Sequence, residues 1–293
     1  MKEDYLILWN INFNCINCQQ IIKCEDIYTF LDDNFSQIRK EYEDNIGNII
    51  NEDQYVEDPY EYPIYGITNY KCPKCNKHLE IQVVFSAYDK ETCSFYDIKG
   101  TIPFIPFQVL KGEEIKEIIL EFIFRWYHLM ERIDIVTPYL DQYGYEFLGK
   151  LPKFIYYYNH KAIINIITRK GRNAIKKKDG KIIFGATGKV LLDRLFEAEK
   201  CETCMVNNSL ISYGNCLACI KLSNRLKLII PDIPHSHFHA KWYAGIKNKT
   251  VEILITSHNL TKVGKLQPET VGLIIVDSRE YQERFLSKLN IIH

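Results

Sequence analysis

The hydrophobic residues of the second half of the chain follow two spacings. Ile115, Ile118, Phe122 and Trp126 recur at helical spacing, which predicts a long amphipathic helix over residues 113–132. Short apolar runs predict buried strands at residues 133–137, 162–168, 226–230, 238–245, 251–257 and 271–277. Shorter helices are expected at residues 145–150, 188–200 and 278–289. Strands that first alternate with helices and then follow one another predict an α/β domain with a mixed sheet covered on both faces.

The first hundred residues show a different pattern. One helix is predicted around residues 26–42, and the acidic, tyrosine-rich stretch 41–65 has little periodicity, which predicts a solvated loop. Residues 101–108 contain two prolines and are typical of a linker strand. We therefore expect an N-terminal region over residues 1–105 and a larger α/β domain over residues 106–293.

Composition narrows the class of protein. The 293 residues are 46% hydrophobic and 25% charged, which is typical of a folded globular chain and excludes disorder, collagen-like repeats and a coiled coil. No apolar run approaches the roughly 20 residues that a membrane-spanning helix needs, and the opening segment lacks the apolar core of a signal peptide. The expectation is a soluble, cytoplasmic protein that does not act at a membrane.

The net charge of zero conceals an asymmetry along the chain. Residues 1–65 carry fourteen acidic and four basic side chains, so the rest of the chain has a basic excess. An acidic N-terminal region joined to a basic remainder predicts two parts with different partners. We expect a protein partner for the acidic region and a polyanion for the basic part.

The spacing of the cysteines predicts metal binding. Ten cysteines in a chain without an export signal do not indicate disulfides, because a reducing cytosol does not maintain them. Eight of the ten form four Cys-x-x-Cys pairs, and two such pairs complete a tetrahedral Zn²⁺ shell. These are Cys15, Cys18, Cys72, Cys75, Cys201, Cys204, Cys216 and Cys219. We expect two structural zinc ions and no catalytic metal, because four thiolates leave no position for water.

The two expected zinc sites differ in how compactly they are encoded. The C-terminal pairs form a self-contained finger at about residues 200–220, inserted in the second domain. The N-terminal pairs resemble the two knuckles of a zinc ribbon, with residues 19–71 inserted between them. Cys24 or His78 could replace one of the four ligands there, and Cys93 is expected to be an inert buried thiol.

Five polar residues of the second domain have the chemistry of a site that cleaves phosphodiesters. His239 and Lys241 are two residues apart on a predicted strand, so both side chains emerge on the same face. Ser257 and Asn259 repeat this spacing at the end of the next strand, and Glu269 follows after a loop. Together they supply a nucleophile or base, groups that hold phosphate oxygens, and an anion that orients the imidazole.

This pattern resembles the signature of the phospholipase D superfamily over roughly residues 111–293. The matching segments are His239-Ala240-Lys241, Thr256-Ser257-His258-Asn259 and Glu269. Thr256 stands where the family usually has glycine, and Ile246 where it has an aspartate that supports the hairpin. The resemblance implies a phospholipase D-like mixed sheet flanked by helices and a metal-independent phosphodiesterase.

The motif is present once, and the resemblance therefore implies a homodimer with two motifs facing each other across a two-fold axis. His239 of one subunit would attack phosphorus and form a phosphohistidine, while His239 of the other would protonate the leaving oxygen and then activate water. Lys241, Ser257 and Asn259 would hold the phosphate oxygens, and Glu269 would orient an imidazole. His258 is expected to point to the opposite face.

Charge indicates the substrate. Residues 150–200 hold thirteen basic and four acidic side chains, and the resemblance places the most basic part near the rim of the site. Its cations are Arg169, Lys170, Arg172, Lys176, Lys177, Lys178 and Lys181. An isolated charge run is often a solvated loop, but next to zinc modules this one favours a track for the phosphates of a nucleic acid.

The leading hypothesis is a homodimeric endonuclease acting on DNA or RNA, by analogy in restriction or defence against phage, whose zinc modules position the nucleic acid. One alternative is a non-catalytic zinc-finger adaptor that binds nucleic acid with a degenerate phospholipase D-like fold. Another is a phosphodiesterase acting on lipids or small molecules. A metal site formed by His235, His237 and His239 also stays open.

Overall fold

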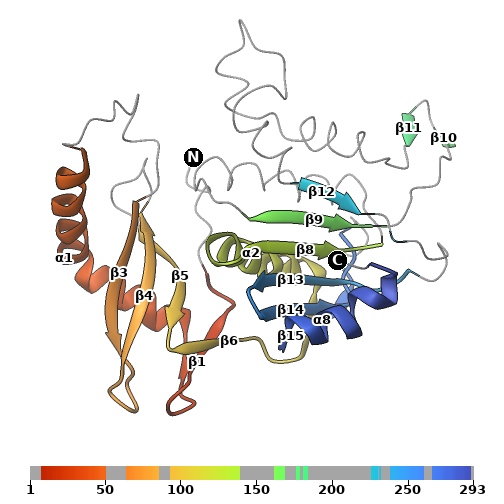
Figure 1. Cartoon of the computed structure of the whole chain (residues 1–293). Helices are drawn as coiled ribbons and strands as arrows, with labels where there is room; N and C mark the ends of the chain where they lie inside the picture. Colours follow the sequence, from red (N-terminus) through yellow and green to blue (C-terminus); the bar gives the residue numbers. More distant parts are fainter. Residues whose placement is uncertain are drawn as a thin grey trace, which may run out of the picture. The chain divides into compact units, whose positions relative to one another are not determined.

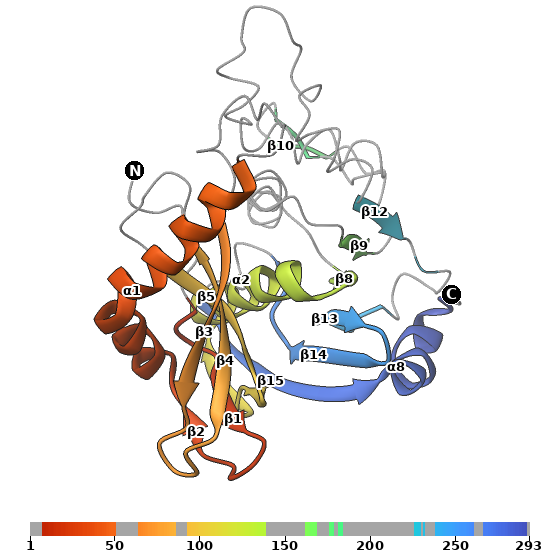
Figure 2. The ribbon, with the colours of Figure 1, turned by 60° about the vertical axis from the view of Figure 1, so that its left-hand side comes forward.

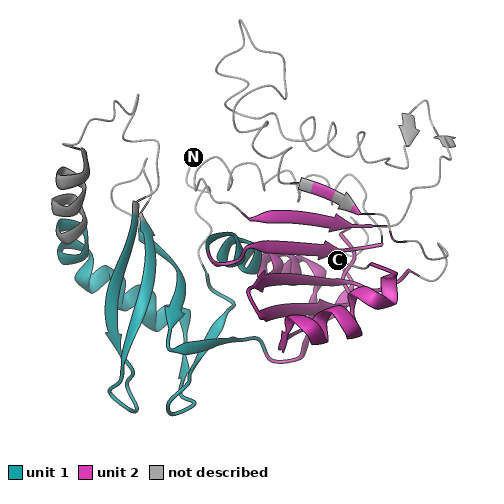
Figure 3. Ribbon diagram, in the orientation of Figure 1, with its two compact units in different colours: residues 1–105, 120–128 teal, residues 106–119, 129–293 magenta. Residues whose placement is uncertain are grey.

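The computed structural model of the chain contains two compact units (Figure 3). Unit 1 comprises residues 1–105 and 120–128, and unit 2 comprises residues 106–119 and 129–293. The structure describes residues 8–50, 64–85, 93–138, 162–168, 176–178, 181–183, 226–229, 231, 238–260 and 266–291. The helices expected at 145–150 and 188–200 and the finger at about residues 200–220 lie outside these ranges.

Unit 1 contains two three-stranded antiparallel sheets, with the orders β2-β1-β6 and β3-β4-β5 (Figures 1 and 2). The strands are β1 (Asn12–Cys15), β2 (Ile21–Ile22), β3 (Ile64–Lys71), β4 (His78–Phe85), β5 (Cys93–Lys99) and β6 (Thr101–Phe104). Strand β6 comes from the stretch expected to be a linker strand, and it pairs with β1 along its whole length. The first sheet therefore joins the two ends of residues 1–105, whereas the second is formed by three consecutive strands.

Helix α1 (Cys24–Ile50) is longer than the helix predicted at residues 26–42. It continues through the first part of the acidic stretch, where no proline interrupts the backbone hydrogen bonds. The side chains of Ile27, Leu31 and Ile38 are buried, and the ring of Tyr28 lies 5.1 Å from that of Phe95. An amphipathic face thus anchors a helix whose other residues are largely charged.

Helix α2 (Gly112–Leu129) contributes residues 112–119 to unit 2 and residues 120–128 to unit 1. Within unit 1, the buried Glu121 carboxylate accepts hydrogen bonds from the backbone N–H and the side-chain amide of Asn10, at 2.9 and 2.6 Å. Arg125, one turn further on, donates to Asp97 at 2.9 Å. These partners satisfy charges that would otherwise be costly to bury. No helix in the described part of the chain is long and apolar enough to cross a membrane.

Unit 2 is built on a seven-stranded mixed sheet with the order β12-β9-β8-β13-β14-β15-β7. Its strands are β7 (Gln108–Lys111), β8 (Arg132–Val136), β9 (Ile163–Ile167), β12 (Leu226–Ile229), β13 (Trp242–Lys247), β14 (Thr250–Thr256) and β15 (Pro268–Asp277). β12, β9 and β8 are parallel, whereas β13, β14, β15 and β7 pair antiparallel. The expected mixed sheet is confirmed. β10 (Lys176–Lys178) and β11 (Lys181–Ile183) form a separate antiparallel pair.

The central strands of this sheet are buried on both faces. One face packs Trp242, Ala244 and Ile253 against helix α8 (Ser278–Arg284) and the 3-10 helix η3 (Leu286–Leu289). The other buries side chains that alternate with these, including Ile133, Ile135, Tyr243 and Leu254. The residues predicted as a single helix, 278–289, form two helices, with Phe285 as the C-cap of α8 and the N-cap of η3.

A hydrogen-bonded network lies buried between α8 and the sheet. Tyr281 donates its hydroxyl to the fully buried Asp134 carboxylate at 3.0 Å and accepts a bond from the Trp242 indole at the same distance. Asn165 donates to the second oxygen of Asp134 at 2.7 Å. Arg132 lies on the same strand as Asp134, and its Nε atom is 3.2 Å from the Asp134 oxygen that Asn165 binds. The network joins β8, β9, β13 and α8.

Replacing Tyr281 with phenylalanine is expected to lower the free energy of unfolding by about 2–3 kcal/mol, because a buried indole N–H loses its acceptor and a buried carboxylate loses a donor. Urea unfolding followed by tryptophan fluorescence measures the change. Tyr243→Phe is the matched control: Tyr243 is also fully buried, but its hydroxyl has no hydrogen-bond partner among the described residues. Equal effects of the two substitutions would contradict the role of the network.

Candidate functional site

Each Cys-x-x-Cys pair of unit 1 forms the same tight turn. The N–H of Gln19 donates to the carbonyl of Cys15 at 2.8 Å, and the N–H of Asn76 donates to the carbonyl of Cys72 at 2.9 Å. In each turn, a second hydrogen bond of 2.9 Å runs from the N–H of the first cysteine to the carbonyl of the residue five positions later. Gln19 and Asn76 occupy the left-handed region, with φ of 58° and 57°. The two turns thus have the same backbone geometry.

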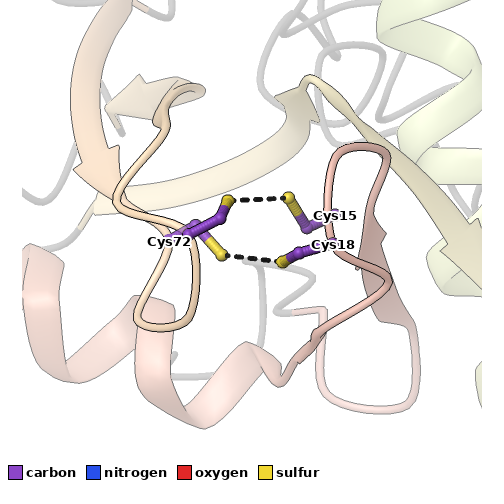
Figure 4. Close-up of side chains that lie close together, drawn as sticks. Cys15, Cys18 and Cys72 are labelled. Carbon is purple, nitrogen blue, oxygen red and sulfur yellow. Dashed lines mark hydrogen bonds between the residues drawn. The ribbon is translucent and has the colours of Figure 1, made fainter.

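The two turns bring four thiols together (Figure 4). The Sγ atoms of Cys15 and Cys75 are 3.8 Å apart, those of Cys18 and Cys72 are 3.6 Å apart, and all four lie within 4.8 Å of one another. A disulfide would require about 2.05 Å. Four thiolates about 2.3 Å from a tetrahedral Zn²⁺ would lie about 3.8 Å apart, which matches these separations. The cluster could therefore hold a zinc ion.

The surroundings of this four-cysteine cluster favour the thiolate form of one member. Hydrogen bonds from the Asn17 side chain and from the Lys77 backbone lower the pKa of the Cys75 thiol to about 6. Thiolates, and not thiols, bind metal ions. Asn17 lies in the first turn and Cys75 in the second, so this hydrogen bond links the two turns in addition to the contacts between their thiols. No spacing or motif in the sequence indicates this role for Asn17.

The other candidate ligands of unit 1 lie outside the cluster. The buried Cys24 donates its thiol to the Ile11 carbonyl at 2.8 Å, and burial raises its pKa. His78 is exposed at the start of β4. The four-thiol group includes neither of them, so these alternatives for the first site are not supported. Burial raises the pKa of the half-buried Cys93 to about 12, as expected for an unreactive thiol.

In unit 2, the predicted catalytic residues lie at one edge of the sheet. β13, β14 and β15 are neighbours and antiparallel, so the start of β13, the end of β14 and the start of β15 meet at the same edge (Figure 1). The carboxyl ends of the parallel strands β8 and β9 also reach this edge, because β8 is antiparallel to β13. The sheet order therefore brings together residues that are up to 30 positions apart in the sequence.

His239 and Lys241 lie just before β13, which begins at Trp242, and not on the strand as predicted. Pairing with β14 continues slightly beyond the strand, since Thr256 N–H lies 3.4 Å from the Lys241 carbonyl. The ammonium group of Lys241 donates to the carbonyl of His239 at 3.0 Å. The His239 side chain is exposed. Both residues are therefore positioned by the entry to a central strand.

Ser257 and Glu269 are joined directly. Ser257 follows β14 and lies opposite Thr270 on β15, where the Ser257 N–H donates to the Thr270 carbonyl at 3.1 Å. Its hydroxyl donates to the Glu269 carboxylate and accepts from the Thr270 N–H at 2.8 Å. The hydroxyl and the carboxylate of the predicted site thus form one unit. The contribution of the Thr270 backbone was not foreseen.

Exposure alternates through the segment that follows β14. Ser257 is exposed, His258 is fully buried and Asn259 is half-buried, as expected if His258 points to the opposite face. Within the described part of the chain, neither ring nitrogen of His258 has a hydrogen-bond partner, and the Oδ1 atom of Asn259 has none either. Burial lowers the pKa of the His258 imidazole; the charge of Glu269 opposes this shift, and those of Lys116 and Lys241 add to it.

The burial of His258 predicts an acid-dependent loss of stability. An unfolded histidine has a pKa of about 6.5, and the folded value is lower, so protonation favours unfolding. Above about pH 7, the titration of His258 does not change the free energy of unfolding. Below about pH 6.5, it lowers the free energy of unfolding by up to about 1.4 kcal/mol for each pH unit. Urea unfolding between pH 5 and 8 should show this slope in the wild type and a smaller one in His258→Gln. Identical slopes would contradict a buried neutral imidazole.

The remaining predicted residues are only partly covered by the structure. The backbone of Lys176, Lys177 and Lys178 forms β10, and that of Lys181 opens β11, where it pairs with Lys178. The other cations of the basic stretch and the cysteines of the second finger lie outside the described residues. These are Arg169, Lys170, Arg172, Cys201, Cys204, Cys216 and Cys219. Strand β9 ends at Ile167, at the edge of the sheet that carries His239.

No known family model matches the chain. No curated protein matches its sequence either. Among solved structures, it is similar to the yeast tyrosyl-DNA phosphodiesterase, with 12% identity, a TM-score of 0.34 and coverage of 63% of this chain and 38% of that chain. It is also similar to Nuc, a phospholipase D family member from Salmonella typhimurium, with 15% identity, a TM-score of 0.33 and coverage of 63% and 91%. The chain spans little more than a third of the yeast enzyme.

Proposed function

We propose that the chain is a phosphodiesterase of the phospholipase D type that cleaves DNA or RNA. The observation that supports the proposal is that residues bearing an imidazole, an ammonium, a hydroxyl and a carboxylate lie along one edge of the unit 2 sheet. His239 and Lys241 enter β13, Ser257 leaves β14, and Glu269 begins β15. The hydrogen bond from Ser257 to Glu269 joins two of these strands at the site.

The proposed reaction has two steps. In the first, the imidazole nitrogen of His239 forms a bond to phosphorus, the bond to the leaving oxygen breaks, and a second imidazole gives its proton to that oxygen. In the second, water attacks phosphorus, its proton passes to the second imidazole, and the bond between nitrogen and phosphorus breaks. Two imidazoles are needed, and the motif supplies one, so we propose that His239 of a second copy is the other.

The neighbouring groups have separate roles in this proposal. Lys241 follows His239 by two residues, and its ammonium group donates to the His239 carbonyl. On substrate binding, the ammonium would instead donate a hydrogen bond to a phosphate oxygen. Asn259 would donate its amide to a second oxygen. Glu269, fixed by Ser257, would carry the negative charge that orients an imidazole. Because histidine acts as the nucleophile, the mechanism does not call on a divalent metal ion.

We also propose that both zinc sites are structural. The four-cysteine cluster would hold one ion with all four positions filled by thiolates, which leaves none for a reacting water. Cys201, Cys204, Cys216 and Cys219 would hold the second. Zinc in unit 1 would connect two turns far apart in the sequence, in a zinc-ribbon-like arrangement. Its contribution is to folding, and the chemistry stays with unit 2.

Cleavage in the presence of a chelator tests the proposed activity. Labelled single- and double-stranded DNA and RNA, and a phosphatidylcholine vesicle as the lipid phosphodiester, are incubated with the protein and enough EDTA to remove free Mg²⁺. We expect one or more nucleic acids to be cut and the lipid to be left intact. Cleavage of the lipid alone would identify a lipid phosphodiesterase. Binding of nucleic acid without any cleavage would identify a non-catalytic adaptor.

Neutralising the strand β10 lysines is expected to weaken substrate binding and not the chemical step. In Lys176→Ala/Lys177→Ala/Lys178→Ala, we expect KM for a nucleic acid to rise on the order of 10-fold at moderate salt, because three phosphate contacts are lost, with kcat nearly unchanged. Steady-state cleavage at several salt concentrations measures this. An unchanged KM would show that the basic stretch is only a solvated surface.

A further inference from the structure

Unit 1 presents a group of cations on one turn of the four-cysteine cluster. Residues 66–79 contain three lysines and no acidic side chain, although residues 1–65 are strongly acidic. Lys71, Lys74 and Lys77 are all exposed, and so is His78. We refer to these four residues as the basic tip. A concentrated positive charge on an otherwise acidic unit requires an explanation.

The fold holds the basic tip in one place. Lys71 ends β3 and lies directly opposite His78 at the start of β4, so their side chains leave the sheet on the same face. Lys74 lies inside the turn, and its ammonium group donates to the Cys18 carbonyl of the other turn at 3.4 Å. Lys77 follows Asn76, the residue in the left-handed conformation. The cations are therefore arranged by the same turns that bring the four thiols together.

Two carboxylates of this sheet are paired with cations outside the tip. Glu80, two residues beyond His78 on the same face of β4, forms an ion pair with Lys99. Asp97 on β5 binds the Arg125 guanidinium at 2.9 Å. Beside the tip, the first turn exposes Ile16, which is 52% accessible, and no large apolar patch of the kind that inserts into a bilayer accompanies it among the described residues of the two turns.

We propose that the basic tip binds the phosphate backbone of a nucleic acid, and that a metal ion in the four-cysteine cluster fixes the conformation of the turn that carries its cations. Several clustered cations gain affinity by releasing the counterions of a polyanion, whereas a single cation releases few. Without the metal, the turn containing Cys72 loses its anchor to the turn containing Cys15, and its lysines are no longer held in one arrangement. The identity of the polyanion rests on the proposed function of unit 2.

Binding by a full-length protein that cannot cut its probe tests this inference. In a His239→Ala background, the fluorescence anisotropy of a labelled duplex of about 30 base pairs is measured over a range of salt concentrations. In Lys71→Ala/Lys74→Ala/Lys77→Ala, we expect Kd to rise on the order of 10-fold or more near 0.1 M salt. The slope of log K against log salt should become shallower by about 2–3, since each phosphate contact contributes about 0.9.

A matched variant separates the tip from net charge. Lys247→Ala/Lys249→Ala/Lys288→Ala removes the same charge from exposed positions of unit 2, and we expect less than about a 3-fold change in Kd. Both variants should keep the wild-type zinc content, which shows that the cluster is intact. Stripping the metal with a mercurial and a chelator should raise Kd in the wild type and have little further effect in the tip variant.

The outcomes that would overturn the inference differ from those that would overturn the proposed function. Equal losses of affinity in the tip variant and in the matched variant would show that the tip lysines act only through the net charge of the protein. Tip-dependent binding of phosphatidylserine vesicles without tip-dependent binding of the duplex would assign the surface to lipid. Tip-dependent binding by a wild-type protein that cuts nothing would remove the proposed function alone, whereas cleavage with tip-independent binding would remove this inference alone.

Discussion

Replacement of His239 by alanine is expected to abolish phosphodiester cleavage, with a loss of kcat on the order of 10⁴-fold or more, because it removes the group proposed to form the covalent bond to phosphorus. The side chain is exposed and lies just before β13, so its removal opens no cavity in the core. We expect the free energy of unfolding to change by less than about 0.5 kcal/mol. Single-turnover cleavage and urea unfolding of the same preparations measure the two quantities.

The intermediate gives this prediction a second readout. Rapid quenching with a substrate labelled at the scissile phosphate should trap labelled wild-type protein, and the label should be stable to base and labile to acid, as a phosphohistidine is. His239→Ala should trap none. Lys241→Ala should slow the formation of the labelled protein without removing the nucleophile. Wild-type activity in His239→Ala, or a label on another residue, would exclude His239 as the nucleophile.

Mixed subunits test whether two copies share the site. If each site needs His239 from both copies, exchange of wild-type with an equal amount of His239→Ala subunits should leave about a quarter of the activity of an all-wild-type sample, since only one dimer in four keeps both imidazoles. Independent sites would leave about half. Analytical ultracentrifugation of the mixture determines the oligomeric state. Activity in a monomer would exclude a shared site.

Loss of one ligand of the four-cysteine cluster is expected to unfold part of unit 1. Structural zinc contributes on the order of 10 kcal/mol to the folding of small modules. In Cys72→Ser, we expect the zinc content to fall by about one ion per chain. The β3 and β4 amides should also lose their protection from hydrogen exchange. Elemental analysis and hydrogen exchange followed by mass spectrometry measure both effects without reference to activity.

Cys24 provides the matched control for this substitution. Its thiol is buried and bound to the Ile11 carbonyl, outside the cluster. A serine there can keep the same hydrogen bond, so Cys24→Ser should retain the full zinc content and the protection of β3 and β4. If Cys24→Ser lost zinc as Cys72→Ser did, the ligand set given by the geometry would be wrong. If neither variant lost zinc, the cluster would hold no metal.

Apolar runs located most of the unit 2 sheet, because its central strands are buried on both faces and need a continuous apolar sequence. β12 and β14 lie within one residue of the predicted runs. β13 differs: it begins at Trp242 and not at Phe238, whose side chain is buried although its backbone lies outside the ladder. Apolar character therefore reported burial correctly and strand pairing less well. β15 begins at Pro268, where polar residues pair with β7 in a register that hydrophobicity does not encode.

The candidate sites were predictable to different depths. Spacing alone identified the four cysteines of unit 1, because tight turns fix where both thiols of a pair point. It could not exclude Cys24 as a ligand, since that depends on a hydrogen bond to Ile11. In unit 2, the sequence identified Ser257 and Glu269 separately. Their hydrogen bond depends on the pairing of Ser257 with Thr270, a tertiary register that the sequence does not show.

The order of the strands in unit 2 has a consequence for the synthesis of the protein. Strand β7 precedes α2 in the chain, yet its partner in the sheet is β15, which is made long afterwards. The cysteines of unit 1 have all left the ribosome before residue 105, so the metal centre can assemble early, whereas the edge that bears His239 is completed only when Glu269 has emerged. A nascent chain that stops before β15 lacks Glu269 and leaves β14 without its neighbour. We therefore expect incomplete products of translation to be harmless to the nucleic acids of the cell that makes them.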